Sequence, residues 1–89
     1  NMIQTELTVQ NQLGLHARVA SYIVRQAKTF SSDIYINKNE KKYDLKSAIG
    51  VITANAKYQD TLCVVFDGPD EQAASQAITQ LFAQKFGEE

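Results

Sequence analysis

One short stretch of the chain, Gly14 to Ala20, combines side chains that could carry out chemistry. It contains His16, the only histidine in the sequence, and Arg18 two residues later. A strand-like pattern precedes His16 and a helical pattern follows it, so we expect the histidine at the start of a helix. Free backbone N–H groups and the helix dipole there disfavour the imidazolium form, and a neutral ring is a nucleophile. Those N–H groups and the Arg18 guanidinium could also bind phosphate oxygens, which indicates phosphorylation on a histidine nitrogen.

A second interpretation of His16 stays open on these residues alone. A lone histidine at a helix start is more often a surface residue with a satisfied hydrogen bond, because unusual titratable groups mark functional sites only in a statistical sense. The chain would then be a small interaction domain without phosphotransfer, and replacing His16 by alanine would leave its activities intact.

Length, composition and charge exclude several classes of protein. The 89 residues are enough for one domain, which we expect to span residues 2–87. A hydrophobic content of 44% fits a packed core, and a net charge of −1 argues against nucleic acid as a partner. No apolar run approaches the ~20 residues that span a bilayer, so we predict a cytoplasmic protein with no membrane insertion. With one cysteine, Cys63, and no clustered metal ligands, we expect no disulfide framework, metal or cofactor.

The segment around His16 predicts a strand followed by a helix. Residues 3–9 alternate between apolar and polar side chains, which indicates a half-buried strand before the histidine loop. From Ala17 to about Thr29 the apolar residues recur at helical spacing, which predicts a helix led by His16. Its apolar face comprises Ala20, Ile23, Val24 and Ala27. The basic residues on another face are either solvated or form a docking surface for an acidic partner; they are Arg18, Arg25 and Lys28.

The middle of the chain predicts a hairpin and a short helix. Strands are expected at 34–38 and 42–45 around the turn Asn39-Glu40. Ser47 precedes a brief apolar run and is a typical helix N-cap, so we expect about two helical turns after it. The apolar residues of this helix form either part of the core or an exposed patch for a partner; they are Ala48, Ile49 and Ile52.

The last third of the chain predicts a strand, a turn and a closing helix. The strand is expected over 62–66, the turn at Gly68-Pro69, and the helix N-cap at Asp70. The apolar face of that helix comprises Ala74, Ala77, Ile78, Leu81 and Phe82, with Phe86 at its end. We expect residues 87–89 to fray. The order β-α-β-β-α-β-α indicates an α+β domain, in which helices cover one side of an antiparallel or mixed sheet.

Two motifs in register make the chain resemble the HPr family, the histidine-containing phosphocarrier proteins of the bacterial phosphoenolpyruvate-dependent sugar phosphotransferase system. The stretch Gly14-Leu15-His16-Ala17-Arg18 matches the family's phosphorylation motif, G-(L/I)-H-A-R-P-A. The stretch Lys46-Ser47-Ala48-Ile49-Gly50-Val51 matches a second motif, close to K-S-I-M-G-V. The resemblance covers essentially the whole chain and implies an open-faced β-sandwich, in which three helices cover one side of a four-stranded antiparallel sheet.

The resemblance implies a phosphocarrier that turns nothing over by itself and is therefore not an enzyme. His16 would accept a phosphoryl group from enzyme I through Nδ1 and pass it to a IIA domain of a sugar permease. Arg18 would lie beside that group, and the backbone N–H groups of Ala17 and Arg18 would hold its oxygens. The residues implied in partner docking are Leu15, Arg25, Lys28, Ala48, Ile49 and Ile52.

The resemblance also implies a regulatory alternative at Ser47. In some bacteria a serine kinase/phosphorylase modifies the matching serine and makes the protein a partner of a catabolite control regulator. A phosphate at a helix N-terminus is stabilised there and would place negative charge beside the apolar patch. In relatives without the kinase the serine is only a cap. The chain could thus be a regulator related to the catabolite-repression HPr homologue, although that homologue lacks the active histidine retained here.

Several positions depart from the family motifs. Val19 stands where the first motif has proline, so the backbone has an N–H at this position. Valine restricts the unfolded chain less than proline does, which costs roughly 0.4–1 kcal/mol of stability. Leu13 replaces a small polar residue, Ala48-Ile49 is a smaller pair than Ile-Met, and residues 55–59 replace a loop richer in glycine. We expect a monomer, with a dimer swapped through the first strand as the alternative; the sequence does not name the permease served.

Overall fold

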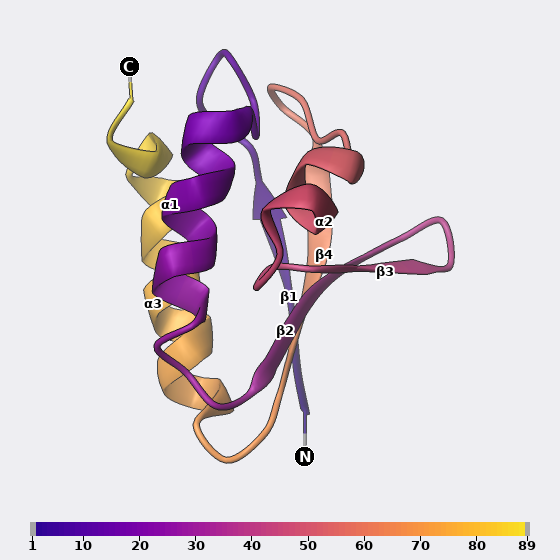
Figure 1. Ribbon diagram of the computed structural model, residues 1–89, viewed down its shortest axis with the longest axis vertical. Helices are drawn as coiled ribbons and strands as arrows, with labels where there is room; N and C mark the ends of the chain where they lie inside the picture. The colour runs from indigo at the N-terminus through magenta and orange to yellow at the C-terminus, as the bar shows by residue number, and fades with distance from the viewer. Residues whose placement is uncertain (1, 89) are drawn as a thin grey trace.

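The computed structural model describes residues 2–88, which form four strands, three α-helices and a short 3₁₀ turn (Figure 1). In chain order these elements are β1 (Met2–Thr8), α1 (Ala17–Ala27), β2 (Asp33–Lys38), β3 (Lys41–Asp44), α2 (Ala48–Thr53), β4 (Thr61–Asp67), α3 (Glu71–Ala83) and the 3₁₀ turn Lys85–Gly87. The predicted order and the α+β class are confirmed. None of the helices in this described part is long and apolar enough to cross a membrane.

The strands form one antiparallel sheet in the order β1-β4-β2-β3. β4 lies between β1 and β2, and it carries the apolar run that is typical of a strand inside a sheet. Its residues Val64 and Phe66 face the helices, whereas Val65 points to the other side, where Gln4 and Tyr35 flank it in register. The strand order, which periodicity left open, is set by the pairing of β4 with both β1 and β2 and of β3 with β2.

The helices cover one face of the sheet and enclose the core between themselves and the strands (Figure 1). α1 buries Val19, Ala20, Ile23 and Ala27. α3 buries Ala74, Ile78, Leu81 and Phe82. The predicted faces are therefore mostly confirmed, but Val24 and Ala77 are only half-buried and Val19 is an additional core residue. Val19 lies four residues before Ile23 and so shares its face of α1, whereas Val24 lies at the edge of that face.

The predicted hairpin is confirmed, with β2 and β3 joined by the two residues Asn39 and Glu40. Both residues have positive φ, 53° and 65°, as a type I′ turn requires. β3 begins one residue earlier than predicted, so Leu45 follows the strand rather than ending it. Leu45 is nevertheless buried, since its backbone N–H donates to Ile34 O and holds the segment against β2.

Asp70 stands at the N-cap position of α3, but its side chain does not cap the helix as predicted. Its carboxylate instead accepts hydrogen bonds from the backbone N–H groups of Ser31 and Ser32, both at 2.9 Å, and from the Ser32 hydroxyl. The α1–β2 loop is thereby fixed to the β4–α3 turn. Sequence position identified the cap site, whereas the competing donors come from a loop 38 and 39 residues away.

The hydrogen bonds that Asp70 accepts from Ser31 and Ser32, which we call the Asp70 clamp, predict that the stability of the fold is sensitive to acid. Hydrogen bonds from the Ser32 hydroxyl and the Ser31 N–H lower the pKa of Asp70 from 3.8 to about 2. A depressed folded-state pKa stabilises the fold above pH 3.8, and this contribution is lost as the pH falls from 3.8 to about 2. Asp70→Asn should lower the urea midpoint at neutral pH and flatten its decline in acid, measured against Asp67→Asn as a charge control. An equally steep decline in Asp70→Asn would contradict the clamp.

Candidate functional site

His16 is the N-cap of α1, as predicted, and its half-buried side chain is 30% exposed. Its backbone carbonyl accepts from Ala20 N–H at 2.8 Å, while its side chain makes no cap hydrogen bond. The N–H groups of Ala17, Arg18 and Val19 come before the first helical hydrogen bond, and none of them donates to a group within residues 2–88. These N–H groups, next to an imidazole, are suited to binding an anion.

Gly14 shapes the loop that delivers His16 to the helix start. Its φ of 73° is left-handed, and its N–H donates to Asn11 O at 3.2 Å. A Cβ at this position would lie 2.8 Å from Ala56 O. Because Leu15 N–H donates to the same carbonyl at 3.2 Å, the loop is held close to the segment after α2. Glycine in the first motif is therefore required by the backbone path.

The C-terminal tail contributes a carboxylate to the His16 site. Glu88 Oε2 lies 2.7 Å from His16 Nε2 and 3.2 Å from an Arg18 guanidinium nitrogen. Glu88 Oε1 accepts from Asn11 Nδ2 at 2.9 Å. The hydrogen bond from Asn11 is the largest cause that lowers the pKa of Glu88; burial opposes it, and His16 and Arg18 lower it further. Glu88 is therefore an ionised carboxylate at neutral pH.

The prediction that the tail frays is wrong for Gly87 and Glu88, and Glu89 lies outside the described residues. Phe86 is buried and packs edge-to-face on Phe82, with ring centroids 4.8 Å apart. Lys85 and Phe86 both have positive φ, 56° and 55°, and turn the chain back toward α1. Two successive left-handed residues that are neither glycine nor asparagine have no recognisable sequence signal. The one usable signal was Phe86, which extends the apolar face of α3.

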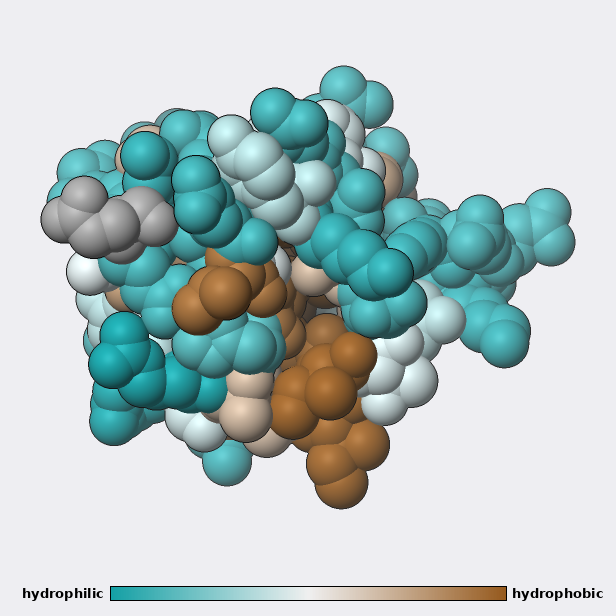
Figure 2. All heavy atoms as spheres, turned by 90° about the horizontal axis from the view of Figure 1, so that it is seen from above, coloured by the Kyte–Doolittle hydropathy of each residue, from teal (hydrophilic) through white to brown (hydrophobic). Residues whose placement is uncertain are grey.

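An apolar surface adjoins His16 on the side of α2. The ring lines an open hollow of about 550 Å³, whose other walls come from the loop before α1, from Ile52 and from residues 55–58. Leu13, Ile52 and Tyr58 are exposed around it, and Ile49 is 77% exposed one turn before Ile52 on α2. Figure 2 looks onto this end and shows hydrophobic atoms near its middle and in a larger group that runs from the middle to the lower edge of the view. We call Leu13, Ile49, Ile52 and Tyr58 the apolar patch.

The residues expected to dock partners divide into exposed and buried ones. Arg25 and Lys28 are exposed on α1 and at its C-cap, and the Arg25 guanidinium lies 5.8 Å from the centre of the Tyr22 ring. Ile49 and Ile52 are exposed on α2, whereas Ala48 is half-buried and Val51 is the buried residue of this helix. Leu15, however, is only 5% exposed and belongs to the core. The expectation that Leu15 offers a docking surface is therefore wrong.

The second motif has a structural explanation at three of its positions. The Ser47 hydroxyl caps α2 by accepting from Gly50 N–H at 3.2 Å, as predicted. Lys46 Nζ donates to Phe30 O at 2.8 Å, which ties the start of α2 to the loop after α1. A Cβ on Gly50 would lie 2.8 Å from Asp44 O. The motif therefore fixes α2, and with it the exposed Ile49 and Ile52, in position.

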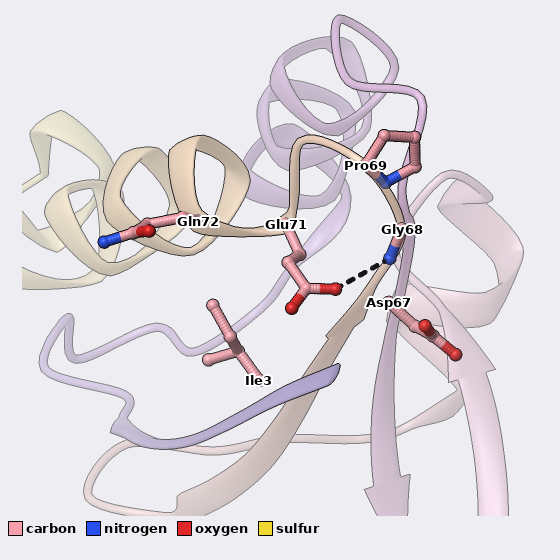
Figure 3. A pocket seen from close by; sticks show the side chains of 6 residues that line it. All are labelled: Ile3, Asp67, Gly68, Pro69, Glu71 and Gln72. Carbon is pink, nitrogen blue, oxygen red and sulfur yellow. Dashed lines mark hydrogen bonds between the residues drawn. The ribbon is translucent and has the colours of Figure 1, made fainter. Parts of the chain in front are cut away.

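A second hollow, of about 560 Å³, lies where β4 joins α3 (Figure 3). Its walls include the carboxylates of Asp67 and Glu71 and the side chain of Ile3. Glu71 Oε1 accepts from Gly68 N–H at 3.0 Å, so this carboxylate is already used to hold the turn. No nucleophile or cation is among the lining residues, and we assign no function to this hollow.

Comparisons with known proteins point to a single family. A family model described as the PTS HPr component phosphorylation site matches residues 3–84. Phosphocarrier protein HPr of Cupriavidus necator is 39% identical over 87 residues, which are 98% of each chain. A crystal structure of HPr from Thermoanaerobacter tengcongensis is similar at a TM-score of 0.91 and 34% identity, covering 98% of both chains. Crh of Bacillus subtilis, a catabolite repression protein crystallised as a swapped dimer, matches at a TM-score of 0.71 and 29% identity, covering 93% of this chain and 94% of Crh.

Proposed function

The chain belongs to the HPr family of phosphocarrier proteins, and from this premise we propose that His16 is its phosphoryl acceptor. In this proposal His16 takes a phosphoryl group on Nδ1 from phosphorylated enzyme I and passes it to IIA domains of sugar permeases. In this proposal the protein acts in the cytoplasm. It is a carrier, because each transfer needs a partner that supplies or removes the phosphoryl group. It requires no cofactor or metal for either step.

The observation that supports this proposal best is the position of His16 at the N-cap of α1. The N–H groups of Ala17, Arg18 and Val19 are without acceptors in the described residues and can donate to phosphoryl oxygens. The Val19 N–H adds a donor that the proline of the motif lacks. Arg18, whose side chain is largely exposed, can swing its guanidinium onto the transferred group and neutralise part of its charge.

The surface around His16 supports docking of an acidic partner with an apolar centre. Arg25 and Lys28 on α1 offer positive charge, while Ile49 and Ile52 on α2 offer exposed apolar area. Apolar residues supply most of the energy of such contacts, and charges steer the encounter and set its orientation. The same surface would serve enzyme I and IIA domains in turn, since each must approach the same histidine.

A regulatory role through phosphorylated Ser47 is the second candidate. Ser47 is half-buried at the N-cap of α2, beside the exposed Ile49. A phosphate there would interact favourably with the helix N-terminus and repel an acidic partner from the patch. The protein would then act through a serine kinase/phosphorylase and a catabolite control regulator. The retained pair of His16 and Arg18 favours the carrier function.

Phosphorylation by the host's own enzyme I tests the proposal. The protein is incubated with phosphoenolpyruvate and enzyme I, and intact masses are compared for wild type, His16→Ala and Ser47→Ala. We expect one acid-labile phosphoryl group on wild type and on Ser47→Ala, and none on His16→Ala. Transfer of the label to a IIA domain would then establish the second step. Absence of label on a folded wild-type protein would overturn the carrier function.

A further inference from the structure

We propose that Glu88 is a positioning residue, which holds the His16 ring in the tautomer that carries its proton on Nε2 and leaves Nδ1 free to attack. Asn11 holds Glu88 in place for this purpose. The inference rests on the proposed acceptor function of His16 and deepens it, because it names groups that prepare the ring. The inference rests on the chain of contacts from Asn11 through Glu88 to His16.

The orientation of the Asn11 amide is fixed by its surroundings. Asn11 is fully buried, and its Nδ2 lies 2.8 Å from Gly14 O and 2.9 Å from Glu88 Oε1. Both neighbours are acceptors, so the NH₂ group must face them and use its two protons on them. The amide oxygen is left without a partner among the described residues. The reverse orientation would place that oxygen against two other oxygens.

The contact between Glu88 and His16 then defines the ring tautomer. An ionised carboxylate can only accept hydrogen bonds, so a ring nitrogen 2.7 Å from Glu88 Oε2 must be protonated. In a neutral imidazole the other nitrogen, Nδ1, therefore carries the lone pair. The same oxygen also accepts from the Arg18 guanidinium at 3.2 Å. The side chain of Glu88 is only 10% exposed, which limits competition from water.

This tautomer lets the phosphoryl group enter and leave without a proton transfer. During uptake the Nδ1 lone pair forms the N–P bond while the donor's bond to phosphorus breaks, and the ring becomes cationic with its proton still on Nε2. During release the N–P bond breaks, Nδ1 keeps the electron pair, and the neutral ring returns. Glu88 faces the charged ring in the phosphorylated state. With the proton on Nδ1, a deprotonation would have to precede attack.

A glutamine at position 88 cannot replace the carboxylate. Glu88 uses one oxygen for Asn11 and the other for His16 and Arg18, so both ends of the group must accept. An amide has one acceptor and one donor, and its NH₂ would face either the Asn11 NH₂ or the protonated ring nitrogen. Asn11→Asp tests the same chain from the other side, because it removes both Asn11 donors and keeps the shape of the side chain.

Nitrogen NMR of the unphosphorylated protein tests the tautomer independently of any transfer. Wild type, Glu88→Gln, Asn11→Asp and the control Glu6→Gln are labelled with ¹⁵N at histidine and observed at about pH 8.5, where imidazole is neutral. Glu6 is exposed on the outer face of the sheet, so its variant matches the change in charge. We expect a slowly exchanging Nε2–H signal in wild type and Glu6→Gln, and its loss in Glu88→Gln and Asn11→Asp.

Phosphorylation rates with enzyme I complete the test. Glu88→Gln should be phosphorylated about tenfold more slowly than wild type and Glu6→Gln, the smaller of the losses seen when a histidine loses an orienting carboxylate. Unchanged Nε2–H signals and rates in a folded Glu88→Gln protein would overturn the inference. A wild type that shows the Nε2–H signal but takes no label would contradict the carrier function instead, so the two failures are distinguishable.

Discussion

Replacing Ile49 by aspartate should weaken binding to enzyme I and to IIA domains about 30-fold, while the fold stays intact. Ile49 is 77% exposed on α2, at the side of the His16 site. An apolar side chain at the centre of an interface is worth about 2 kcal/mol or more, which corresponds to that factor. A carboxylate there would also repel an acidic partner. Because the side chain touches little of its own protein, stability should change by less than about 0.5 kcal/mol.

Calorimetric titration of enzyme I with Ile49→Asp measures this effect, and Met2→Asp is the matched control. Met2 is also an exposed apolar residue, 52% accessible, but it lies at the start of β1, far along the strand from the His16 loop. Thermal unfolding of both variants checks that the fold is retained. Equal affinities for Ile49→Asp and wild type would show that partners do not dock on α2. Equal losses in both variants would point to an effect of charge alone.

The elements of the fold follow from local patterns because each of those patterns is also a packing requirement. Alternation in β1 and the helical spacing of α1 and α3 reflect which side must face the core, and the structure buries those sides. Val19 was missed although it lies four residues before Ile23 on the same face of α1, where the structure buries it. Strand order depends on contacts between distant segments, which no local pattern records.

The first motif predicted the position of the site. The spacing of residues in the sequence could not predict the contacts that Glu88 makes there. His16 and Arg18 lie together because they start one helix, so their neighbourhood follows from local geometry. Glu88 is 72 residues from His16 and 77 from Asn11, and it arrives through two left-handed residues at the tail. Composition and periodicity make a charged C-terminus look like a solvated end. Only the three-dimensional path shows that its carboxylate is held by specific donors.

Leu15 illustrates the opposite error, in which a motif position was given a function that the structure explains by packing. It lies beside His16 in sequence, but its side chain turns inward and its N–H bonds to Ala56 O. In the second motif Lys46 and Gly50 also have structural roles, since Lys46 anchors α2 and Gly50 permits close approach to Asp44. The residue type at a motif position can thus be required by the backbone geometry that holds the site, and not only by the chemistry of the site.

Gly14→Ala should destabilise the protein by about 3 kcal/mol, from two separate causes. The left-handed φ of 73° costs an L-residue roughly 1–2 kcal/mol. The new Cβ would lie 2.8 Å from Ala56 O, and relieving that overlap costs roughly 1–3 kcal/mol because a backbone atom must move. The loop that would shift is the one that carries His16. We therefore expect slower phosphorylation by enzyme I together with a lower free energy of unfolding.

Gly87→Ala separates the two causes and gives the prediction its control. Gly87 has nearly the same φ, 79°, but a Cβ there meets nothing within 4 Å. Its variant should lose at most about 1 kcal/mol, since the gain from a stiffer unfolded chain offsets part of the strain. Urea unfolding measures both variants under the same conditions. Equal losses would mean that φ alone decides the cost, whereas the larger loss in Gly14→Ala would assign the difference to the close approach of Ala56, which fixes the path of the chain into His16.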